Sequence, residues 1–109
     1  MFAAHEVAKQ LIHSLSTPIR LIEERDGDLA KQLRRAAASV LFNVVEGNRR
    51  LKKDRQHLFR VAAGSAAEVG AALEVARAWS YIPEARAIEA LALVDRELGL
   101  LWGLTKRSA

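Results

Sequence analysis

Apolar residues recur through most of the chain at spacings of three and four, which is the period of a helix that buries one face. Between about residue 3 and residue 24 this stripe consists of Val7, Leu11, Leu15, Ile19 and Ile22. Pro18 lies inside the stripe and cannot donate a backbone hydrogen bond, so we expect a kink or a break near Ser16–Thr17. The pattern therefore predicts a first amphipathic helix with a bend.

Three more segments show the same period. They predict a second helix from about residue 29 to 47, a third from about 54 to 79, and a fourth that begins near Pro83. The connection over residues 48–53 lacks apolar periodicity and is basic. The predicted core stripe of the fourth helix is Ile88, Leu91, Val94, Leu98, Leu101 and Trp102.

Asp side chains lie where two of these helices should begin. Asp26 or Asp28 can cap the second helix and Asp54 the third, because a carboxylate accepts hydrogen bonds from the free N–H groups of a first helical turn. Four amphipathic helices with short connections favour antiparallel neighbours. We therefore expect an all-α fold, an antiparallel up-and-down four-helix bundle, with residues 1–109 forming a single domain.

Composition is consistent with that fold and excludes some classes of function. The chain is 50% hydrophobic, only 6% aromatic, and contains no Cys, so disulfide frameworks and thiolate chemistry are excluded. No stretch approaches the roughly 20 apolar residues of a membrane helix. We expect a cytoplasmic protein without a membrane partner.

The predicted helices carry more apolar surface than one bundle can bury. On the second helix Val40 and Val44 point one way, whereas Phe42 points nearly opposite. The third helix has a ridge of small residues at Ala63, Ala67 and Ala71, which would allow close helix approach. The excess favours self-association over scattered surface exposure. The residues expected at that interface are Leu41, Phe42, Val45, Leu93, Leu100 and Leu104.

Polar side chains line one edge of the second helix and part of the third. They are Gln32, Ser39, Asn43, Glu46, Ser65 and Glu68. We interpret them as a hydrogen-bond network that fixes helix register, because no His or Lys joins them as a base beside a nucleophile. His5, His13 and His57 lack the spacing of a metal site and are expected at the surface. No enzyme activity, metal or cofactor is expected.

Positive charge is concentrated in one region. Residues 31–60 carry nine basic and two acidic side chains, although the whole chain has a net charge of +4. Such clusters attract phosphate backbones. The residues expected to contact nucleic acid are Arg34, Arg35, Arg49, Arg50, Lys52, Lys53, Arg55 and Arg60. The alternatives are a solvated charged connection, or a scaffold whose basic patch meets an acidic protein.

Two blocks of sequence resemble a known family. The first is the run from Gln32 to Arg50, and the second runs from Phe59 to Val69, with Tyr81-Ile82 at the turn of the closing helix. Together they resemble the bacterial four-helix bundle proteins that include the 23S rRNA intervening-sequence proteins. The resemblance implies a four-helix bundle and a homopentameric ring. It also relates the chain to the accessory protein of diversity-generating retroelements, and so implies RNA, DNA or a reverse transcriptase as possible partners.

Overall fold

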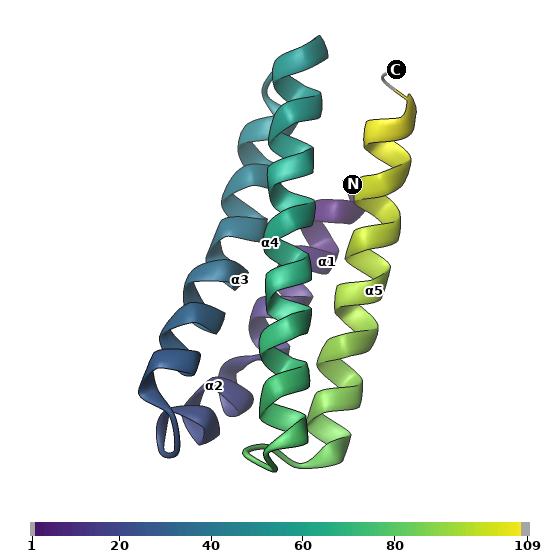
Figure 1. The fold of residues 1–109 in the computed structure, drawn as a ribbon. Coiled ribbons are helices and arrows are strands. Elements are labelled where there is room, and N and C mark those ends of the chain that lie inside the picture. The colour runs from purple at the N-terminus through teal and green to yellow at the C-terminus, as the bar shows by residue number, and fades with distance from the viewer. Residues whose placement is uncertain (1, 108–109) are drawn as a thin grey trace.

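The computed structural model describes the backbone of residues 2–107 and the side chains of residues 2–106. Within that range the helices are α1 (Ala3–Ser14), α2 (Ser16–Glu23), α3 (Gly27–Asn48), α4 (Lys52–Ala78) and α5 (Glu84–Arg107). Because α1 and α2 follow one another as a single bent arm, the five helices make a four-helix bundle (Figure 1). The predicted all-α, up-and-down bundle is confirmed.

The bend lies at Leu15, close to the predicted break. Pro18 has no N–H to donate to the carbonyl four residues earlier, so the helical ladder is interrupted there. The Ser14 hydroxyl donates to the Leu11 carbonyl at 2.8 Å. The second arm then resumes with the Ile19 N–H bonded to the Leu15 carbonyl at 2.9 Å. The bend thus lets one predicted helix follow the bundle as two pieces.

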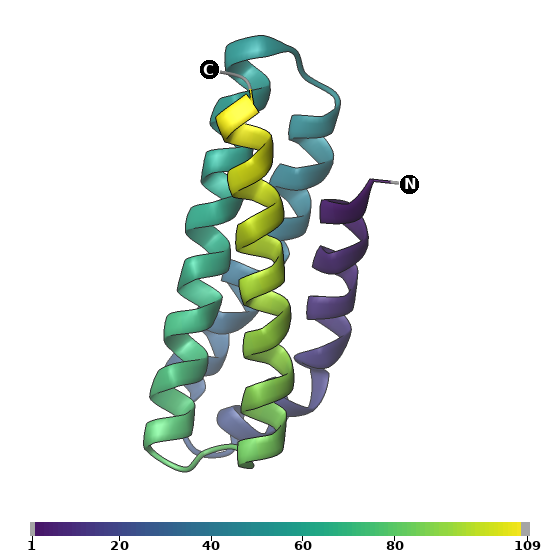
Figure 2. The same cartoon turned by 90° about the vertical axis from the view of Figure 1, so that its right-hand side faces the viewer.

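The helices pack in a closed order around the core. α3 packs against α4, α4 against α5, and α1 against both α5 and α3, while α2 covers part of α3. α3 and α5 run in the same direction from diagonal positions, with α4 antiparallel to both (Figures 1 and 2). The α3–α4 connection and the end of α5 lie toward one end of the 42 Å long bundle, and α1 starts some way short of that end (Figures 1 and 2).

The helix starts differ in how they are capped. The Asp26 carboxylate accepts a hydrogen bond from the Leu29 N–H at 3.1 Å, as predicted. The predicted Asp54 cap is wrong, because α4 begins at Lys52 and Leu51 occupies the cap position without a side-chain bond. The connection is only residues 49–51, shorter than predicted. α3 ends one residue beyond Gly47 and α4 begins before Asp54, so periodicity alone placed the start of α4 too late.

Much of the core consists of small side chains. On α5 the buried positions are Ala87, Ala90, Val94, Glu97 and Leu101. Two residues predicted for this core, Ile88 and Trp102, are instead 55% and 63% exposed. Small alanine side chains let α5 approach its neighbours closely. The buried stripe is therefore rotated away from the one that the bulky residues suggested.

The second apolar stripe of α5 lies on the side of the bundle that α1 covers. Leu93, Leu100 and Leu104 are half-buried and pack against the core. Leu100 and Leu104 line a hollow together with Phe2 and Ala3 at the start of α1. The exposed apolar surface of α5 is consequently formed by Ile88 and Trp102 rather than by these three leucines.

Candidate nucleic-acid interface

The basic end of the bundle is formed by Arg49, Arg50, Lys52 and Lys53, where α3 turns into α4. The two helices meet closely here, because a Cβ on Gly47 would lie 2.7 Å from the nearest ring carbon of Phe59. The turn is tight enough that Lys52 adopts a φ of 52°, in the left-handed region. A three-residue connection between two tightly packed helices therefore holds these four cations together.

Three of the eight predicted cations are engaged within the subunit. The Arg55 guanidinium lies 4.8 Å from the Phe59 ring centroid and its Nη1 donates to the Asn48 carbonyl at 3.4 Å. Arg50 pairs with Glu46 at 3.0 Å, and Arg34 pairs with a glutamate of α2 at 3.5 Å. Arg55 thus closes the end of α3, and is less available to a ligand than the sequence suggested.

The other five cations are exposed and make no ion pair with any side chain among residues 2–106. They are Arg35, Arg49, Lys52, Lys53 and Arg60. Arg35 lies 14 residues before Arg49, the residue that follows the end of α3, which separates them by about 21 Å. The structure therefore brings together the cations of the connection and leaves Arg35 well away from them.

Arg60 lies farther down α4 in a hollow of about 510 Å³ that it shares with Trp102 and Thr105. The Lys106 ammonium group is 4.6 Å from the centroid of the Trp102 ring. Lys106 was absent from the predicted site. Its spacing of four from Trp102 was the signal that could have placed both side chains on one face of a helix.

The predicted polar network is smaller than expected. The Ser39 and Ser65 hydroxyls are 2.7 Å apart, and the Asn43 amide donates to the Ser39 carbonyl at 2.9 Å. The Ser39–Ser65 bond joins α3 to α4, whereas the Asn43 bond lies within α3. Glu46 pairs instead with Arg50, while Gln32 and Glu68 are exposed on the rim of a shallow hollow. The three bonded residues hold two helices in register and do not pair a base with a nucleophile.

Glu97 is a buried polar group that sequence analysis missed. Its side chain is 0% exposed, and neither carboxylate oxygen has a hydrogen-bond partner in the described part of the chain. Burial raises the pKa of Glu97 to about 7. Its position three residues after Val94 and four before Leu101 puts it in the buried stripe of α5, a signal that the sequence contained.

Over the stretch that the structure describes, no group of three or more His, Cys, Asp or Glu side chains could hold a metal ion. None of the helices there is both long and apolar enough to cross a bilayer.

Comparison with known proteins decides the family. Residues 3–103 match the 23S rRNA-intervening sequence protein family. The chain belongs to this family. The predicted resemblance is thereby confirmed over nearly the whole length of the chain. No curated protein matches the sequence.

A solved structure is similar to the bundle. It is a protein with unknown function from the S23 ribosomal protein family of Bacteroides thetaiotaomicron. The TM-score is 0.86 at 16% identity, and the match covers 94% of this chain and 98% of the other. At this identity the likeness establishes a shared fold.

Proposed function

We propose that the chain is a non-catalytic, self-associating helical module whose basic end binds RNA or DNA through the phosphate backbone. The observation that carries the proposal is the cluster of Arg49, Lys52 and Lys53. These three side chains are exposed, lie together at one end of the bundle and make no ion pair within the described residues. Unpaired clustered cations release counterions from a phosphate chain when they bind it.

The lack of base-reading groups favours sequence-tolerant binding. The connection that holds the cluster contains no aromatic side chain, and its cations are long and flexible. Phosphate contacts position a protein on nucleic acid without reading its sequence. The family description refers to an intervening sequence of 23S rRNA, so RNA is the first ligand to test.

The non-catalytic part of the proposal rests on the polar groups themselves. Ser39 and Ser65 bond to each other, and the Asn43 amide donates to the Ser39 hydroxyl, so within the described residues neither hydroxyl is paired with a general base. Glu97 is buried and has no hydrogen-bond partner among the described residues, and this burial keeps it away from a substrate in solvent. None of these groups is arranged as an activated nucleophile.

Self-association would multiply the basic end. A ring of identical subunits would present the cluster several times, and several weak phosphate contacts would then act together on one strand. We therefore expect a long strand, which can reach several subunits, to bind more tightly than a short strand that reaches only one.

The test is an anisotropy titration with labelled single-stranded RNA and DNA over a range of salt concentrations. The variant Arg49→Gln/Lys52→Gln/Lys53→Gln removes the cluster. Each lost phosphate contact reduces the salt slope of log K by about 0.7 for a single strand. We expect the triple variant to make this slope shallower by about 2 and to weaken binding at least tenfold.

A matched control removes the same charge elsewhere. Arg20, Arg86 and Arg96 are exposed and make no ion pair within residues 2–106, so Arg20→Gln/Arg86→Gln/Arg96→Gln is the control. It should keep most of the salt slope. An equal loss in both variants would reject the cluster as the site. An absence of binding to either nucleic acid at low salt would reject the function and favour an acidic protein partner.

A further inference from the structure

We infer that Arg55 positions the basic end instead of binding phosphate itself. The rings of Phe2 and Phe59 hold its guanidinium group against the end of α3, and this fixes the α3–α4 connection together with its cations. The inference rests on the proposed function, because it concerns the same basic end. It also gives a role in binding to Phe2, an uncharged residue at the start of the chain.

The Arg55 guanidinium group lies against two aromatic rings. Its central carbon is 4.8 Å from the centroid of the Phe59 ring and 6.0 Å from the centroid of the Phe2 ring. The two ring centroids are 5.9 Å apart, and Phe59 is buried. A guanidinium group within about 6 Å of an aromatic centroid is attracted to the face of the ring. The two rings therefore restrict where this side chain can point.

The same guanidinium group is bonded to the last turn of α3. Its Nη1 donates to the Gly47 carbonyl at 3.5 Å, and to both the backbone and the side-chain oxygen of Asn48 at 3.4 Å. The last carbonyls of a helix lack intrahelical partners and form the negative end of the helix dipole, so a cation is stabilised there. Because Arg55 belongs to the first turn of α4, its side chain joins the two ends of the connection.

The backbone of the connection is strained where α4 begins. Lys52 has a φ of 52°, in the left-handed region that residues other than glycine rarely adopt. Such a conformation persists only where the surrounding structure holds it. Arg55 follows Lys52 by three residues and bonds back to α3, so it is placed to hold the strained turn closed.

Phe2 is held in place by α1 and not by the connection. Its carbonyl accepts hydrogen bonds from the N–H groups of His5 and Glu6 at 3.1 and 3.2 Å, so it is fixed at the first turn of that helix. Figure 2 shows the start of α1 just below the end of α3. Loss of the Phe2 ring would give the guanidinium group more room to move without changing any charge of the basic end.

A positioning role and a direct phosphate contact make different demands on residue 55. A phosphate contact needs a positive charge, which lysine also supplies. The positioning role needs a planar group that lies on two rings while it donates to two carbonyls, and lysine lacks that group. Arg55→Lys therefore keeps the charge and removes the support of the connection. Phe2→Ala weakens the same support from the other side.

Trypsin digestion of the folded chain measures how often the connection opens, because the four cations of the basic end are cleavage sites. Proteolysis of a folded protein follows the population of locally opened states. We expect cleavage after residues 49–53 to be at least about fivefold faster in Arg55→Lys and in Phe2→Ala than in the unmodified chain. Cleavage after Arg96, inside α5, reports global unfolding in the same digest and should not change.

An anisotropy titration with single-stranded RNA measures whether the fixed connection contributes to binding. Each variant should bind at least about threefold more weakly, because the cations must be ordered on binding. The salt slope should change by less than the roughly 0.7 that one lost phosphate contact costs. The double variant should bind no more weakly than the weaker single variant, because both changes remove the same support. Phe2→Tyr keeps a ring and should behave as the unmodified chain.

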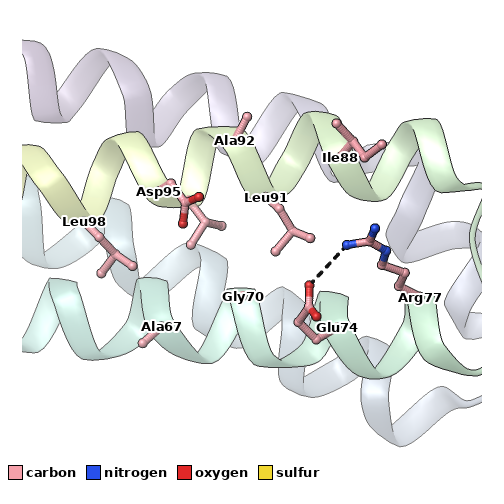
Figure 3. Close-up of a pocket in the computed structure, with 10 residues that line it drawn as sticks. Ala67, Gly70, Glu74, Arg77, Ile88, Leu91, Ala92, Asp95 and Leu98 are labelled. Atoms are coloured by element: carbon pink, nitrogen blue, oxygen red, sulfur yellow. Dashed lines mark ion pairs between the residues drawn. The ribbon is translucent and has the colours of Figure 1, made fainter.

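A matched control makes the same change at another arginine of α4. Arg77 pairs with Glu84 at 2.6 Å and with Glu74 at 3.7 Å, and the second pair is drawn in Figure 3. Arg77→Lys should leave both the cleavage after residues 49–53 and the RNA affinity unchanged.

The two measurements separate failure of this inference from failure of the proposed function. Unchanged cleavage in Arg55→Lys and Phe2→Ala would overturn the inference, because the connection would then be held without either side chain. Faster cleavage with unchanged RNA affinity would overturn it as well, because a loose connection would bind equally well. Faster cleavage in a chain that binds no nucleic acid, even unmodified, would support Arg55 and Phe2 as the residues that fix the connection and would reject the proposed function alone.

Discussion

Helix α5 has two apolar sides, and the subunit covers them unequally. On one side Leu93, Leu100 and Leu104 are half-buried, with α1 lying against this side of the bundle. On the other side Ile88 and Trp102 line two hollows between α4 and α5 and are more than half exposed. The same periodicity produced both stripes. The difference shows that an apolar stripe predicts a contact without specifying whether the partner belongs to the same chain.

The largest expected effect comes from truncating neighbouring residues on the two sides of α5. Leu101 is fully buried, so Leu101→Ala should lower the free energy of unfolding by about 2–5 kcal/mol. Trp102 is 63% exposed, and Trp102→Ala should lower it by less than about 1 kcal/mol in a monomeric background such as Phe42→Glu. Urea unfolding followed by circular dichroism measures both. Equal losses of unfolding free energy in the two variants would mean that Trp102 is also covered within the subunit.

The next effect concerns the buried carboxyl of α5. Because burial raises the pKa of Glu97 from 4.5 to about 7, the folded state binds more protons than the unfolded state between these values. The contribution of Glu97 to the free energy of unfolding should be greatest below pH 4.5. It should fall by about 3 kcal/mol as the pH rises to 7.

The Glu97→Gln variant tests this assignment, because an amide does not titrate. The difference in unfolding free energy between Glu97→Gln and the unmodified chain should change with pH over that window, and this difference cancels the contributions of the other acids. A difference that stays constant from pH 4.5 to 7 would show that Glu97 titrates normally, and that the inner side of α5 is wetter than the structure indicates.

A smaller effect is expected where α3 and α4 approach most closely. Gly47→Ala would put a Cβ 2.7 Å from the ring of Phe59, which is buried and has little room to move. We expect a loss of about 1–3 kcal/mol. Gly64→Ala is the control, because open space surrounds that helical position and Ala favours a helix by up to about 1 kcal/mol. Thermal denaturation should shift in opposite directions for the two variants.

The sequence predicted the fold better than the site. Helical periodicity predicted the helices, Pro18 predicted the bend, and Asp26 predicted one cap. Each of these features depends on the local sequence. The buried stripe of α5 was misplaced because the packing of alanines depends on how close neighbouring helices come. Glu97 was missed although its spacing from Val94 and Leu101 placed it in the buried stripe, because a carboxyl group is expected at the surface.

The candidate site illustrates the same limit. The charges of residues 31–60 could be counted from the sequence. Which of these cations bind other groups of the same subunit could not be predicted. Arg55 closes the end of α3 only because Phe2 and Phe59, which are far apart in the sequence, meet beneath its guanidinium group. Helical geometry likewise separates Arg35 from Arg49 by about 21 Å. Which cations stay free for a ligand is a property of the folded bundle.

Self-association should cover the exposed apolar side chains of Phe42, Ile88 and Trp102 with further copies of this chain. Sedimentation equilibrium of the unmodified chain at micromolar concentration tests it most directly. We expect a mass of several times the 12.0 kDa subunit, lowered to one subunit by Phe42→Glu. A mass of 12.0 kDa for the unmodified chain across that range would contradict it.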